Sequence, residues 1–197
     1  MINVYRYVDC TKVEGPGKRF CIWFQGCSHR CEGCYARDTW SFDENQLMRV
    51  SDVMELIDYA PGIEGVTILG GEPFDQPEAL EELVKEIKLR NLSIIVFTGY
   101  TLEEIETSDN ICWRNVLNNI DVLIDGLYEA ANRSFDIPLI GSSNQRYYFF
   151  TDRYSMADFE DNKIEIRIGK DGILKFNGMG DFPMLLKKMG RNVDGIQ

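Results

Sequence analysis

Residues 19–35 read RFCIWFQGCSHRCEGCY and combine a predicted strand with three closely spaced cysteines. Its first six residues are mostly apolar or aromatic and predict a strand, after which Gly26 allows a turn. Cys27, Cys31 and Cys34 follow at spacings of four and three residues. Three thiolates in a short loop after a strand favour a soft metal centre, so these three cysteines are the predicted metal ligands.

The residue types leave the identity of that metal open. A structural zinc ion usually takes four protein ligands, and the only nearby fourth candidates are Cys21 and His29. His29 lies inside the ligand loop, where reaching the same metal would be strained. A 4Fe–4S cluster is also normally held by four ligands, so three cysteines would leave one iron open to a substrate or cofactor. A zinc knuckle or a group of reduced structural thiols is the alternative.

Strands and helices alternate along the rest of the chain. Apolar, β-branched or aromatic runs predict strands at 3–8, 19–24, 65–69, 93–98 and 121–124, and later at 145–150, 163–168 and 173–176. Helical periodicity predicts helices at 53–60, behind a Ser51 cap, and at 80–87, behind an Asp75 cap. This alternation predicts an α/β fold with a mostly parallel sheet. The turn signal at 170–172 predicts an antiparallel hairpin added at a sheet edge.

A second loop, residues 69–73 with the sequence LGGEP, follows the strand predicted at 65–69. Ligands of parallel sheets bind at the carboxyl ends of the strands, so we expect this loop to face the same side as the cysteine loop. Gly70 and Gly71 let the backbone approach a ligand, and Glu72 supplies an acceptor for an ammonium group. Thr98 ends the next predicted strand near the same place. A plain strand-to-helix turn is the alternative interpretation.

The three cysteines, the aromatic Tyr35 behind them and the glycine-glycine-glutamate loop resemble the signature motifs of the radical S-adenosylmethionine (SAM) superfamily. The resemblance implies a partial (β/α) barrel that holds one 4Fe–4S cluster, with SAM on the iron that the cysteines leave open. It implies that SAM is contacted by Gly33, Cys34, Tyr35, Gly70, Gly71 and Glu72. By its position at a strand end, Thr98 is expected to hydrogen-bond SAM as well.

Further stretches resemble the anaerobic ribonucleoside-triphosphate reductase activating proteins, namely EGPG at 14–17, TW at 39–40, TGY at 98–100, DVLIDG at 121–126 and GSSNQR at 141–146. The match runs from about Val13 to Phe150 within one domain, 1–197. The resemblance implies an enzyme that cleaves SAM to a 5′-deoxyadenosyl radical, which then takes a hydrogen atom from a glycine of a partner reductase. A flavodoxin or ferredoxin would supply the electron.

Three features depart from that family. The chain continues as a C-terminal extension at about 151–197, Ala36 stands where the family would have asparagine, and Cys21 lies in the strand before the cysteine loop. These departures leave open a radical SAM enzyme that modifies a peptide or small molecule directly. A non-catalytic iron–sulfur or zinc protein is a further alternative.

Composition limits the partners. The chain has 197 residues, 44% of them hydrophobic, and a formal net charge of −11, which argues against nucleic acid or an anionic membrane as the main partner. It has no apolar run long enough to cross a membrane and no signal-peptide pattern, so we expect a cytoplasmic protein.

Other residues with reactive or charged side chains are expected to have structural roles. Cys10, Cys21 and Cys112 are widely spaced and are expected to be buried or partly exposed thiols. Asp121 and Asp125 are expected to cap a strand. The arginines at strand ends, Arg19 and Arg167, are expected to be solvated.

Overall fold

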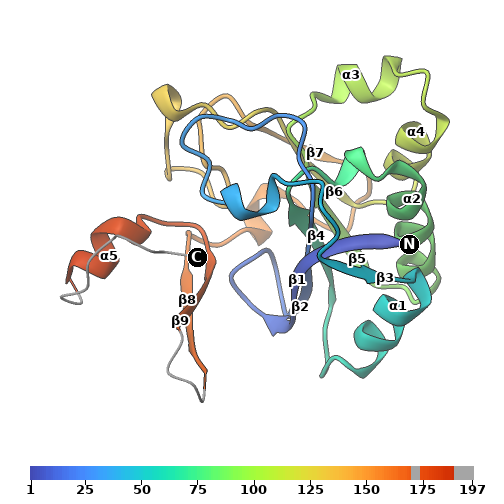
Figure 1. The fold of residues 1–197 in the computed structure, drawn as a ribbon, viewed down its shortest axis with the longest axis horizontal. Helices are drawn as coiled ribbons and strands as arrows, with labels where there is room; N and C mark the ends of the chain where they lie inside the picture. The colour runs from blue at the N-terminus through green and yellow to red at the C-terminus, as the bar shows by residue number, and fades with distance from the viewer. Residues whose placement is uncertain (170–173, 189–197) are drawn as a thin grey trace.

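The computed structural model describes residues 1–169 and 174–188 and has the expected mixed α/β architecture (Figure 1). Its main sheet has seven strands in the order β3-β1-β2-β4-β5-β6-β7. They are β1 (Ile2–Thr11), β2 (Arg19–Phe24), β3 (Gln46–Met48), β4 (Gly65–Gly70), β5 (Ser93–Phe97), β6 (Val122–Asp125) and β7 (Arg146–Phe149). Strands β2, β4, β5 and β6 are parallel neighbours, whereas β1, β3 and β7 pair antiparallel. The mostly parallel sheet is therefore confirmed.

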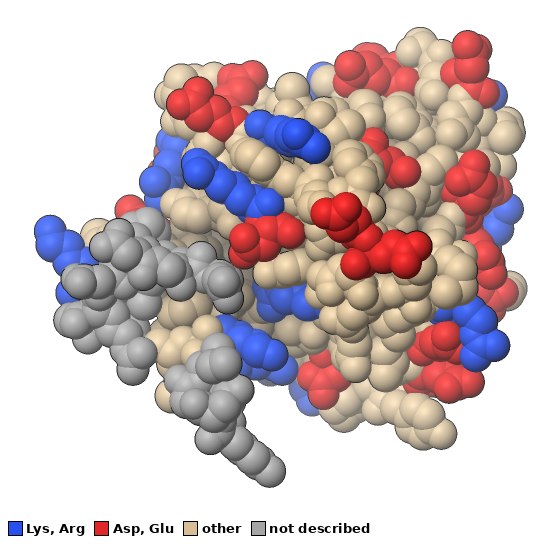
Figure 2. Space-filling model, viewed as in Figure 1, with Lys and Arg blue, Asp and Glu red and all other residues tan. Residues whose placement is uncertain are grey.

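Helices connect these strands on one side of the sheet. They are α1 (Val50–Tyr59), α2 (Pro77–Leu89), α3 (Leu102–Thr107) and α4 (Ile111–Leu117), and α5 (Phe182–Lys188) comes last. Short 3-10 helices lie at η1 (Arg37–Thr39), η2 (Pro73–Asp75), η3 (Ala130–Asn132) and η4 (Met156–Asp158). Figure 2 shows acidic side chains along this helical side, in keeping with the net charge.

The two expected helices exist, but both of the predicted caps were wrong. Arg49 precedes α1, and its backbone N–H and guanidinium both donate to Asp52, so Ser51 is already inside the helix. Asp75 ends η2, and Gln76 is the residue before α2. The Gln76 side chain donates to the carbonyls of Asn3 and Gln25 at 3.0 and 2.9 Å. The Gln76 side chain thus ties the start of α2 to β1 and to the residue after β2, and it does not cap the helix.

The late hairpin is also present at the predicted place in the sequence, but its described residues do not lie at the edge of the main sheet as expected. Strands β8 (Ile164–Ile168) and β9 (Leu174–Gly178) pair antiparallel in a two-stranded sheet of their own. Within the described residues they do not extend an edge of the main sheet, which corrects the expectation. The turn predicted at 170–172 lies outside the described residues.

The main sheet is covered on both faces. On the first face, alternate residues of β2, Phe20, Ile22 and Phe24, join the core formed with α1 and α2. The second face carries the residues that alternate with these along the strands, including Cys21, Trp23, Thr67, Ile95 and Ile124. This double cover explains why β4 and β5 are apolar through most of their length.

Candidate functional site

The cysteine loop and the LGGEP loop leave the sheet side by side. Strands β2 and β4 are parallel, and Phe24 pairs with Gly70, so both loops emerge at the same edge. The Gly71 N–H donates to the Phe24 carbonyl, and the Glu72 N–H to the Gly26 carbonyl, each at 2.8 Å. A Cβ added to Gly71 would lie only 2.0 Å from the Gly26 carbonyl oxygen. Glycine at 71 is therefore required for the two loops to meet.

The three cysteines are free thiols, as are the other cysteines of the chain, all of which lie in the described residues. Cys27 is buried, whereas Cys31 and Cys34 are half-buried. Burial raises the pKa of the Cys27 thiol, and hydrogen bonds from the Arg30 and His29 backbone partly offset this rise. Burial also raises the pKa of Cys31.

The loop fits an iron–sulfur cluster in its donor chemistry. Its turns use left-handed backbone at Arg30 (φ 51°) and Gly33 (φ 76°). The Ala36 N–H donates to Cys34 Sγ at 3.4 Å, the kind of hydrogen bond that tunes cluster sulfurs. Within residues 1–169 and 174–188, no three His, Cys, Asp or Glu side chains converge as the ligands of a single metal ion do. Cluster ligands bind different iron atoms, so a cluster does not require that convergence.

Glu72 is the centre of a buried hydrogen-bond network. Its side chain is 1% exposed. Oε1 accepts from the Phe74 N–H at 2.9 Å and from the Thr98 hydroxyl at 2.8 Å, and Oε2 accepts from the Gly99 N–H at 2.7 Å. A carboxylate offers about four acceptor positions, so these three bonds leave one for another donor. The structure thus brings the predicted site residues Glu72 and Thr98 into direct contact.

His29 faces this carboxylate. Its Nε2 lies 3.3 Å from Glu72 Oε2, close but without the alignment of a hydrogen bond. The Glu72 carboxylate raises the pKa of His29. The imidazole packs edge-on against Tyr100, with ring centroids 4.4 Å apart, and a Cβ on Gly99 would lie 2.6 Å from it. The glycine of the TGY stretch therefore makes room for the histidine of the cysteine loop.

Asp75 and Tyr100 anchor the start of the cysteine loop, a role that the sequence did not indicate. Asp75 Oδ2 accepts from the Ser28 N–H at 2.7 Å, and Oδ1 accepts from the Ser28 and Tyr100 hydroxyls at 3.1 and 3.0 Å. The only local signal is the position of Asp75 shortly after the LGGEP loop. That signal was interpreted as a helix cap.

Tyr35 lies apart from the Glu72 network in its described contacts. It is 47% exposed, and its ring packs edge-on against Phe182 of α5 with centroids 6.0 Å apart. The Arg133 guanidinium lies 5.4 Å from the centre of the Tyr35 ring. Burial raises the pKa of Tyr35, and Arg133 partly offsets the rise.

Asp121 and Asp125 hold strand ends, as expected. Asp121 Oδ2 accepts from the Ile94 N–H at 2.8 Å, and the fully buried Asp125 accepts from the Leu102 N–H at 2.7 Å. Arg146 adds an ion pair to Asp125 at 2.7 Å.

The expected solvation of the arginines at strand ends was wrong for Arg19, which is fully buried. Its guanidinium donates to the Val66 carbonyl at 2.7 Å and to the Thr67 and Ser93 hydroxyls at 2.6 and 2.9 Å. Burial lowers its pKa. Arg167 is half-buried and forms an ion pair with Asp9 at 3.3 Å.

The remaining cysteines are dispersed. Cys21 is fully buried on the second face of the sheet, and burial raises the pKa of its thiol well above the ordinary value. Cys10 and Cys112 are half-buried on β1 and α4.

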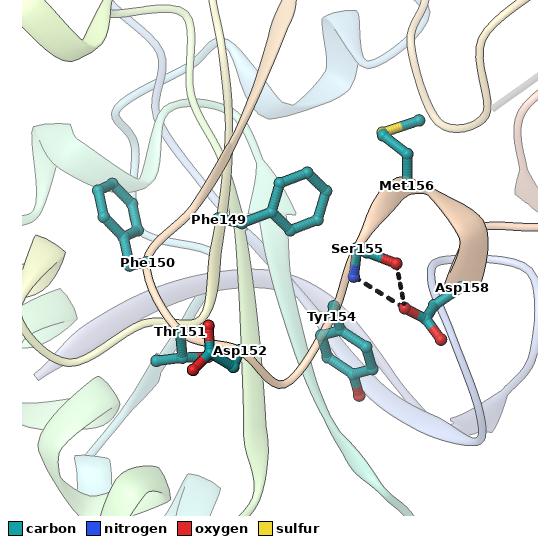
Figure 3. Close-up of a pocket in the computed structure, with 8 residues that line it drawn as sticks. All are labelled: Phe149, Phe150, Thr151, Asp152, Tyr154, Ser155, Met156 and Asp158. Carbon is teal, nitrogen blue, oxygen red and sulfur yellow. Dashed lines mark hydrogen bonds between the residues drawn. The ribbon is translucent and has the colours of Figure 1, made fainter.

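A hollow in the surface lies away from the cysteine loop. It measures about 490 Å³ and is bordered by residues 149–158, including Phe149, Tyr154 and Asp158 (Figure 3). Strand β7 runs from Arg146 beside Asp125 to Phe149 beside Val122, so the hollow lies near the opposite end of the strands. None of its lining residues is a predicted site residue.

No helix among the described residues combines the length and the apolar character needed to cross a membrane.

Comparison with known proteins gives consistent matches. A family model described as a 4Fe-4S single cluster domain matches residues 13–148. The anaerobic ribonucleoside-triphosphate reductase-activating protein of Enterobacteria phage T4 is 36% identical over 157 residues, which are 77% of this chain and 96% of that protein. Proteins of the same name from Pasteurella multocida and Escherichia coli K12 are 34% and 31% identical. Their alignments span 76% and 73% of this chain, and 99% and 96% of the relatives.

Proposed function

The chain belongs to the family of anaerobic ribonucleoside-triphosphate reductase-activating proteins, and we propose that it activates an anaerobic ribonucleotide reductase by radical SAM chemistry. The pairing of the two loops after β2 and β4 carries this proposal, because it joins three free cysteines to Glu72. When bound, a reduced 4Fe–4S cluster would supply the electron that cleaves SAM to methionine and a 5′-deoxyadenosyl radical, which takes a hydrogen atom from a reductase glycine.

The three cysteines of the loop share one proposed role, which is to bind the cluster. Cys27, Cys31 and Cys34 would hold three irons and leave the fourth for SAM. The burial of Cys27 and the loop packed against Gly71 would keep water from that side of the cluster.

Glu72 is proposed to bind the ammonium group of SAM. Thr98 and Gly99 orient its carboxylate, and the remaining acceptor position would take the ammonium hydrogen bond. Because Thr98 and Gly99 already hold the carboxylate, the acid itself need not reorient. The His29 imidazole, 3.3 Å from Oε2, would move to open that position to the ammonium group. Gly33, Tyr35 and the backbone of Gly70 and Gly71 would complete the contacts.

We also propose a barrel architecture for the sheet and an electron donor for the cluster. The parallel strands β2, β4, β5 and β6, with helices on their first face, support a partial (β/α) barrel with the site at the carboxyl ends of its strands. A flavodoxin or ferredoxin would reduce the cluster.

The proposal is tested by anaerobic reconstitution with iron and sulfide. We expect about four irons and four sulfides per chain, and 5′-deoxyadenosine after addition of dithionite and SAM. Electron paramagnetic resonance of the mixture with an anaerobic ribonucleotide reductase should then show a glycyl radical doublet. About one zinc without sulfide would indicate the non-catalytic alternative. SAM cleavage without any glycyl radical would favour direct modification of a peptide or small molecule.

A further inference from the structure

The C-terminal part of this chain extends beyond the family match. The family model ends at residue 148, and relatives aligned over 96–99% of their own length span only 73–77% of this chain. We call the described part of this extra segment, residues 151–169 and 174–188, the strap. It contains η4, β8, β9 and α5.

The strap is first tied to the sheet near the amino ends of the parallel strands. Tyr154 is 8% exposed, and its hydroxyl lies 2.7 Å from Ser93 Oγ and 3.3 Å from Arg19 Nη1. The same hydroxyl donates to Glu64. Phe159 packs with Tyr154 into the core of the second face. This end of the strap is therefore part of the core.

A second tie joins the hairpin to β1 and to the loop after it. Asn177 is 2% exposed, and its Oδ1 accepts from Arg6 Nη1 at 2.7 Å. The Arg6 guanidinium in turn lies 3.7 Å from the centre of the Trp23 ring on the second face. The Gly178 N–H donates to the buried Glu14 carboxyl at 2.6 Å. The strap thus passes from the β7 edge of the sheet to β1.

The third tie reaches the cysteine loop. Tyr35, which directly follows Cys34, contacts both Phe182 and Arg133. Arg133 also forms an ion pair with Asp181, N···O 3.6 Å. The cysteine loop, the segment after β6 and the start of α5 therefore meet at Tyr35.

We propose that the strap determines access to the cysteine loop, with the Phe182–Tyr35 contact as the point that a partner must displace or accommodate. A macromolecule that approaches the loop past Tyr35 meets α5 first, whereas a small molecule passes beside it. The strap is thereby a specificity-determining segment that the aligned relatives do not share. This inference deepens the proposed function by stating what controls the approach of the partner, and it rests on that function only for the identity of the partner.

Alkylation of the full-length, metal-free chain tests this inference. The rates of modification of Cys31 and Cys34 are measured by mass spectrometry with a small reagent, iodoacetamide, and with a bulky one, a maleimide on a polyethylene glycol chain. For Phe182→Ala we expect the bulky reagent to react about three- to tenfold faster, from loss of one aromatic contact, and the small reagent to change little. Met184→Ala is the matched control, because Met184 lies on the same helix and is 51% exposed.

A second variant, Asp181→Asn, tests the same contact region, and Cys112 serves as an internal reference for the alkylation rate. Asp181→Asn removes the ion pair with Arg133 and should raise the rate for the bulky reagent in the same direction. Cys112 on α4 should react equally in all variants. Equal rates for the bulky reagent in wild type and both variants would overturn the inference, as would a parallel rise for both reagents. The measurement involves no SAM cleavage, so its result is independent of failure of the proposed function.

Discussion

The Gly99 N–H donates to Glu72 Oε2 at 2.7 Å, so the backbone at the end of β5 fixes a carboxylate that follows β4. The same carboxylate accepts from Thr98 and Phe74. Three donors, two in the loop after β5 and one in the 3-10 helix η2, therefore define one orientation of the acid.

Glu72→Gln tests that arrangement. A glutamine amide nitrogen cannot accept, so at least one of the three donors loses its partner in a buried place. We expect a loss of about 1–3 kcal/mol in the free energy of unfolding, and weaker SAM binding. Urea unfolding and equilibrium dialysis of SAM measure the two effects. Glu106→Gln, at an exposed position of α3, is the control, and equal stability of the two variants would contradict this account.

Gly71→Ala should separate the two loops. The added methyl group would lie 2.0 Å from the Gly26 carbonyl oxygen, so the backbone must shift. We expect a cost of about 1–3 kcal/mol or more and a loss of iron content after reconstitution. Gly62→Ala is a comparison of the opposite kind, because its φ is positive (59°), unlike that of Gly71, while nothing lies within 4 Å of the added atom. A Gly71→Ala protein with full iron content would show that the close approach is dispensable.

Alanine at Cys27, Cys31 or Cys34 should abolish SAM cleavage, since each removes one of the three proposed cluster ligands. Alanine at Cys112 should leave the iron content and the cleavage rate unchanged. Iron and sulfide analysis with quantification of 5′-deoxyadenosine distinguishes the two classes. Normal cleavage by any one of the three loop variants would remove that cysteine from the ligand set.

Glu14 should make stability depend on pH. Burial raises the pKa of this carboxyl from 4.5 to about 7, although Gly178 and Arg6 act in the opposite direction. Between these two pKa values, Glu14 binds a proton in the folded state but not in the unfolded state. The free energy of unfolding therefore falls as pH rises from about 5 to about 7, and above that range Glu14 lowers it no further.

The variant Glu14→Gln removes the titration but keeps an oxygen that can accept from Gly178. Relative to wild type it should gain stability as pH rises, by on the order of 1–3 kcal/mol at about pH 8. Urea unfolding of both proteins from about pH 5 to about pH 8 measures this difference. A difference that stays constant over the range would show that Glu14 titrates normally.

The sequence predicted the sheet well because its central strands are apolar on both faces. The runs at β2, β4 and β5 are short, buried and bounded by loops, which is a strong local signal. It missed β3, a strand of three residues, because only its pairing with Ile2–Val4 defines it. It also missed α3, although Thr101 and Glu104 form a capping box, and threonine followed three residues later by glutamate is a local signal for a helix start.

At the site, local motifs identified the loops but not the contacts between them. The packing of His29 against Gly99 and Tyr100 joins segments about 70 residues apart, and no periodicity encodes that meeting. Arg19 was expected at the surface because a strand-end arginine normally reaches water. Its burial depends on Ser93 and Tyr154, which are distant in sequence.

The contact between Tyr154 and Arg19 bears on where the chain can be divided. Ending the chain at Phe150, near the limit of the family match, would remove the hydroxyl that bridges Arg19, Ser93 and Glu64. A guanidinium with no water around it would then lose a partner at the base of the sheet. We therefore expect the shortened chain to fold poorly. The end of the strap at Tyr154 is thus part of the folding unit, and only the end at α5 can vary in sequence without loss of the fold.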